Sequence, residues 1–128
     1  MSAATPRHVL IVDDDTDLRQ VISLSVQAMF PDARVRTAEN GEVAMARLAE
    51  DASVTLIILD LLMPGMDGSR FARQLAADPS LSTIPVLVCS SLPRSKLESI
   101  GMPDNVRGYL RKPVTTDKLV REVKALCS

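Results

Sequence analysis

Three short apolar runs constrain the fold of this chain more than any other feature of its sequence. They cover residues 8–12 (HVLIV), 54–59 (VTLIIL) and 84–89 (IPVLVC). None of them alternates polar with apolar residues, and all three are rich in β-branched side chains. Runs of this kind are typical of strands buried on both faces, as in a parallel sheet. Two weaker candidates, 34–38 (RVRTA) and 107–111 (RGYLR), have the polar flanks of edge strands.

Helical patterns separate these candidate strands. The expected buried face of the first helix comprises Leu18, Val21, Ile22, Ser25 and Met29, with Val26 and Phe30 beside it. Asn40 is the expected N-cap of a second helix, and a third helix follows Gly68. Between the fourth and fifth strands we expect a short helix whose capping box is formed by Ser95 and Glu98. In the last helix, apolar residues at i, i+4 and i+7 mark the buried side.

The order of strand and helix, repeated five times, implies a parallel sheet with helices on both faces and right-handed crossovers. A length of 128 residues is typical of one domain, so we expect a single domain over residues 1–128 with a flexible N-terminus at 1–6. The predicted fold class is therefore α/β, a three-layer (βα)5 sandwich around a five-stranded parallel sheet.

Composition and charge argue against several classes of function. The 15 basic and 16 acidic side chains give a net charge of −1, without the basic surplus of a nucleic-acid binder. No stretch approaches the roughly 18 consecutive apolar residues of a membrane helix, and the N-terminus lacks the layout of a signal peptide. Cys89 and Cys127 are too few for a disulfide framework. We expect a cytoplasmic protein that contacts neither nucleic acid nor membrane directly.

Reactive side chains follow four of the five predicted strands. They are Asp13, Asp14 and Asp15 after the first strand, Asp60 after the third, Ser90 and Ser91 after the fourth, and Lys112-Pro113 after the fifth. In an open parallel sheet, ligands bind beyond the carboxyl ends of the strands, where the strand order reverses. The sequence therefore predicts that carboxylates, a hydroxyl and an ammonium group share one edge of the sheet.

Such a cluster of carboxylates has a defined chemistry. Two carboxylates about 4 Å apart repel by roughly 4 kcal/mol at an effective dielectric constant of 20, so a cation or a raised pKa must relieve them. A site built of oxygen ligands suits Mg²⁺. Mg²⁺, a carboxylate, a hydroxyl and an ammonium group are together what phosphoryl transfer to a carboxylate requires. We predict Asp60 as the nucleophile, because it leaves the middle strand.

Four segments carry a resemblance to a known family: VDDD (12–15), LDLLMPGMDG (59–68), PVLVCSS (85–91) and GYLRKP (108–113). In order and spacing, over nearly the whole chain, they resemble the receiver domain of two-component response regulators. The resemblance implies a flavodoxin-like fold with strand order 2-1-3-4-5. It also implies that Asp14 and Asp60 ligate Mg²⁺ directly, Asp13 through water, and Leu62 through its main-chain carbonyl.

The same resemblance assigns roles in phosphoryl transfer and in the response to it. Asp60 would accept the phosphoryl group, and Ser90 and Lys112 would contact its oxygens. Tyr109 would be the aromatic residue whose rotamer follows the switch, and the Lys112–Pro113 peptide would be cis, as is usual in the family. The implied partners are a sensor histidine kinase or phosphotransfer protein, and a downstream protein that binds the fourth helix, fifth strand and fifth helix.

Other interpretations of these residues remain open at the level of sequence. Asp15 is expected to act only at the helix N-terminus, and each remaining residue alone could be an ordinary turn or surface residue. A haloacid-dehalogenase-like phosphatase would need Thr or Val where the chain has Asp17, and the acidic run would repel the phosphate of a flavin. The stronger alternative is a receiver-like binding module that acts without phosphorylation. We expect a regulatory phosphoacceptor, which promotes its own phosphorylation and dephosphorylation, and not an enzyme acting on a separate substrate.

Overall fold

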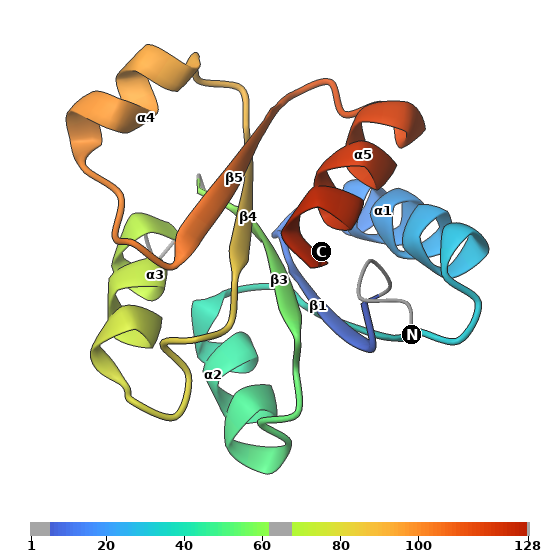
Figure 1. Cartoon of the computed structure of the whole chain (residues 1–128), viewed down its shortest axis with the longest axis horizontal. Helices are drawn as coiled ribbons and strands as arrows, with labels where there is room; N and C mark the ends of the chain where they lie inside the picture. The colour runs from blue at the N-terminus through green and yellow to red at the C-terminus, as the bar shows by residue number, and fades with distance from the viewer. Residues whose placement is uncertain (1–5, 62–67, 128) are drawn as a thin grey trace.

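One parallel sheet organises the computed structural model, which describes residues 6–61 and 68–127 (Figure 1). Its strands are β1 (His8–Val12), β2 (Arg34–Ala38), β3 (Leu56–Asp60), β4 (Val86–Ser90) and β5 (Val106–Arg111). They lie in the order β2-β1-β3-β4-β5, and every pairing between neighbours is parallel. The predicted flavodoxin-like order is confirmed. Residues 1–5 of the predicted flexible N-terminus lie outside the described residues.

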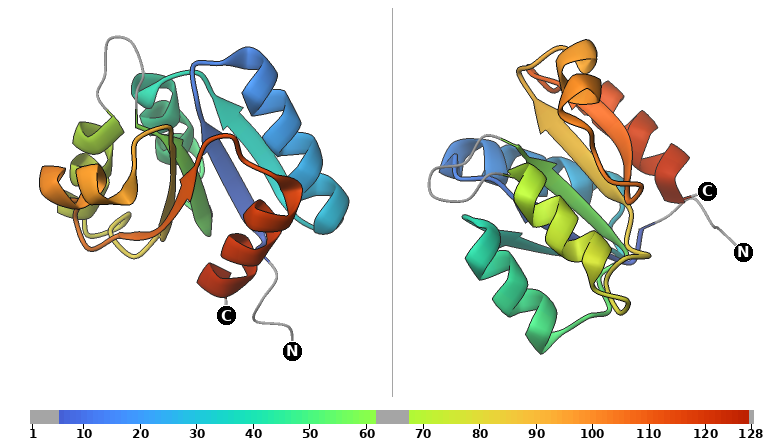
Figure 2. Two further views of the ribbon diagram at one scale, coloured as in Figure 1. Left: turned by 90° about the horizontal axis from the view of Figure 1, so that it is seen from above. Right: turned by 90° about the vertical axis from the view of Figure 1, so that its left-hand side faces the viewer.

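Helices cover both faces of the sheet. They are α1 (Thr16–Met29), α2 (Gly41–Glu50), α3 (Gly68–Ala77), α4 (Arg94–Ile100) and α5 (Thr116–Cys127). Figure 2 shows α1 and α5 on one side of the sheet and the other three helices on the opposite side, which confirms the three-layer sandwich. Within the described ranges, no helix has both the length and the hydrophobicity needed to cross a membrane.

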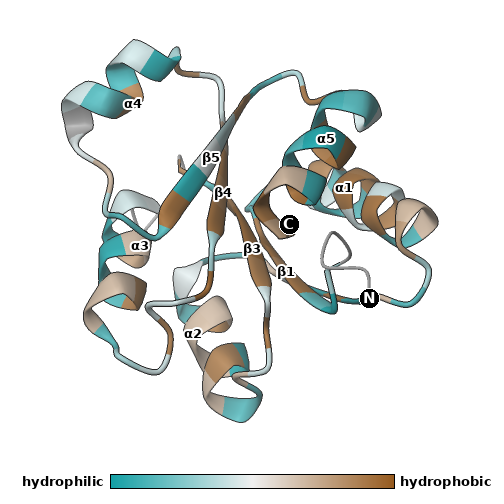
Figure 3. Cartoon of the chain, viewed as in Figure 1, coloured by the Kyte–Doolittle hydropathy of each residue, from teal (hydrophilic) through white to brown (hydrophobic). Residues whose placement is uncertain are grey.

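The core lies on both faces of the three central strands. Every residue of β1, β3 and β4 is buried, and Figure 3 shows apolar residues concentrated along these strands. Successive side chains of a strand point to opposite faces. Leu10 therefore joins the cluster that contains Phe71 of α3, whereas Ile11 joins the cluster that contains Ile22 of α1. Burying one such side chain stabilises the fold by about 1.5–3 kcal/mol, so the continuous apolar runs hold the sheet between its helices.

Two central strands begin and end later than the apolar runs predict. The runs 54–59 and 84–89 correspond to strands Leu56–Asp60 and Val86–Ser90. Pro85 has no N–H to donate to the sheet, although its carbonyl accepts a hydrogen bond of 3.1 Å from Ile57. The shift makes Asp60 and Ser90 the last residues of their strands. The predicted bounds of β1 and β2 are confirmed, and β5 begins one residue earlier than predicted.

The predicted buried face of α1 is partly wrong. Val21 is 57% exposed and Met29 is 46% exposed, whereas Ile22, Val26 and Phe30 are buried. These three buried residues are spaced by four and form one narrow stripe against the sheet. Val21 precedes Ile22 by one residue, so its side chain points about 100° away around the helix.

The start of α4 also differs from the prediction. Pro93 is the N-cap residue and no side chain caps the helix, so the capping box of Ser95 and Glu98 is wrong. Glu98 instead forms an ion pair of 3.4 Å with Arg94, one turn earlier. The helix has only seven residues and ends at Gly101, whose φ of 78° is left-handed, as at many helix C-termini. The short helix predicted here is therefore confirmed, with a different cap.

Candidate functional site

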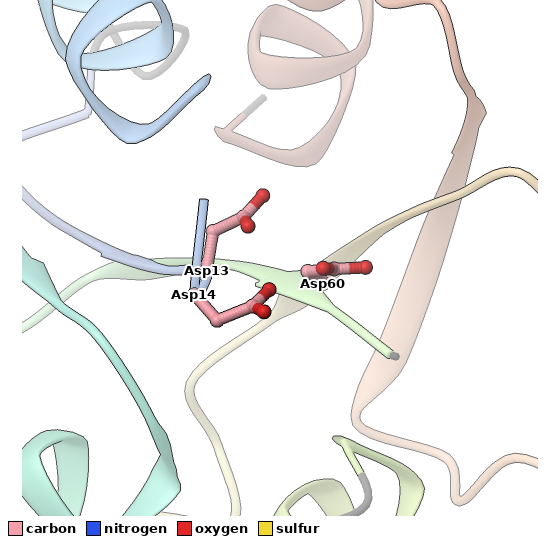
Figure 4. Close-up of side chains that lie close together, drawn as sticks. All are labelled: Asp13, Asp14 and Asp60. Atoms are coloured by element: carbon pink, nitrogen blue, oxygen red, sulfur yellow. The ribbon is translucent and has the colours of Figure 1, made fainter. Parts of the chain in front are cut away.

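Three carboxylates meet at the carboxyl ends of two neighbouring strands. Asp13 and Asp14 directly follow β1, and Asp60 is the last residue of β3 (Figure 4). Each residue has one carboxylate oxygen in the cluster, and these three oxygens all lie within 4.8 Å of one another. Asp13 and Asp60 are buried, whereas Asp14 is exposed. The predicted acidic cluster is therefore present, with two carboxylates in its floor and one at its open side.

Hydrogen bonds fix the turn that carries the first two carboxylates. The main-chain N–H of Asp13 donates to the carbonyl of Ala38 at 3.1 Å and so extends the pairing of β1 with β2. The N–H of Asp15 donates to Oδ1 of Asp13 at 2.9 Å. Asp15 caps α1 as predicted, because its carboxylate accepts a hydrogen bond of 3.1 Å from the N–H of Leu18. The turn thus runs directly into the helix.

Lys112 brings a positive charge to this cluster. Its Nζ atom lies 3.5 Å from Oδ2 of Asp60 and 3.8 Å from Oδ2 of Asp13. The main-chain N–H of Lys112 donates to the carbonyl of Ser90 at 2.8 Å, which continues the pairing of β5 with β4 beyond the strand. The Lys112–Pro113 peptide is cis, as the resemblance implies. The chain therefore leaves β5 with the ammonium group beside the carboxylates.

The charge of the cluster is not balanced by Lys112 alone. The pKa of Asp13 is raised to about 6, chiefly by burial and also by the neighbouring charges of Asp60 and Asp14. The hydrogen bond from the N–H of Asp15 and the charge of Lys112 act in the opposite direction. An oxygen-only set of carboxylates with surplus negative charge fits a hard divalent cation such as Mg²⁺. Leu62, whose carbonyl was the remaining predicted ligand, lies outside the described residues.

Ser90 lies at the same edge of the sheet. Asp60 pairs in register with Cys89 on β4, so Ser90 is one position further along the neighbouring strand. Ser90 is 1% exposed, and its Oγ atom accepts a hydrogen bond of 3.1 Å from the N–H of Leu92. Cys89 points into the core on the α1 and α5 side, where burial raises the pKa of its thiol to about 12. The thiol of Cys89 therefore stays protonated at neutral pH.

Tyr109 lies on β5, between the site and α4. It pairs in register with Val88 and packs partly buried against the core on the α3 side. The guanidinium of Arg94 lies over its ring, with Cζ 5.2 Å from the ring centroid. The two residues share the lining of a cavity of about 270 Å³ between α4 and β5. The predicted switch residue is thus in contact with the short helix.

Two residues of the site were not found from the sequence. Gly68, the first residue of α3, donates its N–H to the carbonyl of Leu61 at 2.9 Å, and a Cβ atom there would lie 2.6 Å from the carbonyl oxygen of Asp60. The available signal was a glycine at the start of a helix, where most other residues have a higher helix propensity. Arg19 of α1 donates from Nη1 to the carbonyl of Asp13 at 2.7 Å. Arginine is common on helices, so its position gave no signal.

This chain is similar in sequence and in structure to known proteins. The family model for the response regulator receiver domain matches residues 9–124. Protein PilH of Pseudomonas aeruginosa is 30% identical over 119 residues, which make up 93% of this chain and 96% of PilH. A solved structure of the chemotaxis response regulator CheY4 of Vibrio cholerae has a TM-score of 0.80 and 28% identity, and the match covers 95% of this chain and 99% of that one.

Some relatives are much longer than this chain. Response regulator PleD of Caulobacter vibrioides is 31% identical over 119 residues, but these cover 93% of this chain and only 26% of PleD. The match to PilH, in contrast, spans nearly the full length of both proteins. The family model begins in β1 and ends in α5, so it includes the acidic cluster, Ser90, Tyr109 and Lys112. The chain belongs to the family of response regulator receiver domains, which are regulatory.

Proposed function

We propose that this receiver domain is a phosphoacceptor switch of a two-component phosphorelay. A phosphoryl group passes to Asp60 from a phosphohistidine of a sensor histidine kinase or of a phosphotransfer protein. The bond from phosphorus to the histidine nitrogen breaks, and a bond from phosphorus to an Asp60 carboxylate oxygen forms, which gives an acyl phosphate. The observation that carries this proposal is the convergence of Asp13, Asp14, Asp60 and Lys112 at one edge of the sheet.

The position of Asp60 suits it to be the nucleophile. It ends β3, the central strand of the sheet. Leu59 directly before it pairs with Val12 of β1, and Asp60 itself pairs with Cys89 of β4. A carboxylate on a rigid strand keeps a constant direction for attack on phosphorus, and positioning supplies much of the rate in phosphoryl transfer. Lys112, at 3.5 Å, offsets part of the charge that Asp60 and the incoming phosphoryl group share.

Asp14 and Asp60 are the proposed direct ligands of Mg²⁺, with Asp13 acting through water and the carbonyl of Leu62 as a further ligand. The surplus negative charge and the raised pKa of Asp13 support this assignment, because a bound cation would relieve both. Mg²⁺, when bound, supplies positive charge against the oxygens of the phosphoryl group. The carboxylates of this chain fix where that charge lies.

Ser90 and Lys112 are the residues that we propose detect the phosphoryl group. The Ser90 hydroxyl accepts a hydrogen bond from Leu92 and still has its own proton to donate to a phosphoryl oxygen. Lys112 can exchange part of its contact with Asp13 for a contact with the new dianion. Both movements pull on the segment that leads into α4 and on the end of β5, so Tyr109 and α4 repack.

The proposed output of the switch is a changed affinity for a downstream protein that binds α4, β5 and α5. Helix α4 has seven residues and no side-chain cap, which makes it an element of low local stability that phosphorylation can shift. Direct contact with nucleic acid or membrane is no part of the proposal. The cytoplasmic location and the single domain over residues 1–128 stay predictions of the sequence.

The test is phosphorylation by a small donor. Incubation with Mg²⁺ and acetyl phosphate should give a phosphoprotein that is labile to hydroxylamine, as acyl phosphates are, and chelation of the metal should prevent labelling. Asp60→Asn should abolish the label. Asp32→Asn is the matched control, because Asp32 is an exposed residue before β2, at the opposite edge of the sheet. Equal labelling of the Asp60 variant would overturn the assignment.

A wild-type chain that takes no label from acetyl phosphate or from a histidine kinase would instead favour the second candidate, a receiver-like module that binds its partner without phosphorylation.

A further inference from the structure

The side chain of Arg19 reaches back from α1 to the turn that carries the acidic pair. Its Nη1 atom donates a hydrogen bond of 2.7 Å to the main-chain carbonyl of Asp13, and Nη2 lies 3.4 Å from the hydroxyl of Thr16. Arg19 is partly buried, and its acceptor belongs to the first residue after β1. A guanidinium held on a carbonyl at this distance makes a charge-assisted hydrogen bond, which is stronger than one between neutral groups.

This hydrogen bond acts on one peptide unit. The carbonyl of Asp13 and the N–H of Asp14 belong to the same planar peptide, so a donor that holds the carbonyl also sets the orientation of the Asp14 backbone. On one side of that unit, the N–H of Asp13 is bound to the carbonyl of Ala38. On the other side, the N–H of Asp15 is bound to the Asp13 carboxylate. Arg19 holds the peptide between these two anchors.

Asp14 depends on that peptide for its direction. Its carboxylate is the exposed member of the acidic cluster, and within the described ranges it makes no hydrogen bond or ion pair. Asp13, in contrast, is held by Asp15 and Lys112. In Figure 4 the Asp14 side chain leaves the end of β1 toward Asp60. Within the part of the chain that the structure describes, no hydrogen bond or ion pair of its own holds this side chain, so its direction follows from the backbone that carries it.

We infer that Arg19 is a positioning residue, which aims the Asp14 carboxylate into the metal site by holding the Asp13–Asp14 peptide. The inference rests on the proposed function, because the site in question is the proposed Mg²⁺ site. Arg19 acts through geometry, since within the described residues its hydrogen bonds go to a neutral carbonyl and a hydroxyl and not to a carboxylate of the cluster. Groups that orient metal ligands in this way typically change metal affinity by 10–100-fold.

The test compares Arg19→Met with Arg19→Lys. Met keeps an apolar stem but loses the donor and the charge, whereas Lys keeps a charged donor. By calorimetric titration, Arg19→Met should bind Mg²⁺ about tenfold more weakly than the wild-type protein, and Arg19→Lys should recover most of the affinity. Arg107→Met is the matched control, because it removes an arginine from the exposed side of β5, near the opposite end of the strand from Lys112. Its Mg²⁺ affinity should equal that of the wild-type protein.

A second measurement needs no metal. In the metal-free protein, Arg19→Met should shift the ¹⁵N resonance of the Asp14 amide and speed its hydrogen exchange, and Arg107→Met should change neither.

A purely structural role at the start of α1 would lower the melting temperature of Arg19→Met and leave its Mg²⁺ affinity unchanged, which would overturn the inference. An Asp14 amide that keeps its wild-type shift and exchange rate would also overturn it. If the wild-type protein binds no Mg²⁺, the proposed metal site is wrong. The resonance and the exchange rate of the Asp14 amide then decide whether Arg19 positions this residue.

Discussion

The ammonium group of Lys112 lies 3.5 Å from Oδ2 of Asp60, although β4 separates the strands from which the two residues come. Adjacent strands are about 4.8 Å apart, so only a long side chain that returns over the edge of the sheet can make this contact. Lys112 is 26% exposed and Asp60 is 5% exposed, which places the pair at the boundary of the core. We therefore expect the contact to contribute to stability, in addition to its proposed role in phosphoryl transfer.

Replacing Lys112 should destabilise the metal-free protein. Lys112→Met leaves Asp13 and Asp60 without their nearby ammonium group, and we expect a loss of about 1–2 kcal/mol in the free energy of unfolding at pH 7, between the values for exposed and buried pairs. Saturating Mg²⁺ should reduce the difference, because a bound cation replaces the missing charge. Urea denaturation with and without Mg²⁺ measures both effects. Lys118→Met, on the exposed side of α5, is the control, and equal stability of the two variants without Mg²⁺ would contradict the prediction.

The raised pKa of Asp13 predicts a pH dependence of stability in the absence of metal. Burial raises the pKa of this carboxyl in the folded protein to about 6, against an ordinary value of 3.8. The folded state therefore favours the protonated form, and this stabilising contribution is present below about pH 4 and is lost as the pH rises through about 6. Asn does not titrate, and its Oδ1 can still accept the hydrogen bond from Asp15.

Asp13→Asn should therefore gain stability relative to the wild-type protein between pH 4 and pH 7, by up to about 3 kcal/mol for a shift of this size. Denaturation curves measured with a metal chelator at several pH values give the difference directly. Adding Mg²⁺ at pH 7 should reverse the order of stability, because the carboxylate is a better partner for the cation than the amide. A difference that does not change with pH would show that Asp13 titrates normally in the folded protein.

Local sequence patterns predicted the elements of the fold, because its central strands are buried on both faces. The five strands and five helices follow from apolar runs and helical periodicity, and the bounds of β1 and β2 were right. The order of the strands came from the resemblance and not from the patterns. The sequence places Val21 on the buried face of α1, but the structure shows it exposed. Helical periodicity does not show how wide a face of the helix the sheet covers.

The sequence predicted that the site residues share one edge of the sheet, but it did not predict all of their contacts. Placing Asp13, Asp60 and Lys112 at strand ends was enough to bring them together, since carboxyl ends of parallel strands share one edge. The contact of Arg19 with the Asp13 carbonyl depends on the rotamer of a long side chain, and the close approach of Gly68 depends on the path of the chain into α3. Neither of these two contacts produces a periodic pattern in the sequence.

Gly68→Ala should disturb the site through the backbone. The added methyl group would lie 2.6 Å from the carbonyl oxygen of Asp60 and from Cα of Leu61, so the end of β3 or the start of α3 must move. We expect a loss of about 1–3 kcal/mol of stability, as for other overpacked positions, together with slower phosphorylation by acetyl phosphate. Gly101→Ala is a useful comparison, because a Cβ there meets nothing within 4 Å, although its φ of 78° costs about 1–2 kcal/mol for Ala. If both variants are phosphorylated at the wild-type rate, the contact of Gly68 with β3 does not matter for the site.

The contact between Arg94 and Tyr109 should bias the switch. Tyr109 is the only tyrosine and the chain has no tryptophan, so tyrosine fluorescence reports this one ring. The guanidinium of Arg94 over the ring stabilises the present rotamer by about 0.5–1 kcal/mol, the value for exposed cation–π pairs. Arg94→Met should therefore shift the unphosphorylated protein toward the other arrangement by a factor of about 2–5.

The measurement is the tyrosine emission before and after addition of acetyl phosphate with Mg²⁺. The wild-type protein should show a change that Asp60→Asn does not show, and Arg94→Met should start closer to the final value and change less. Lys96→Met, which removes a positive charge from the same helix, is the control, because the ring contact is made by Arg94. Emission of Arg94→Met that matches the wild-type protein in both states would mean that the ring is held by its packing against α4 and not by the cation.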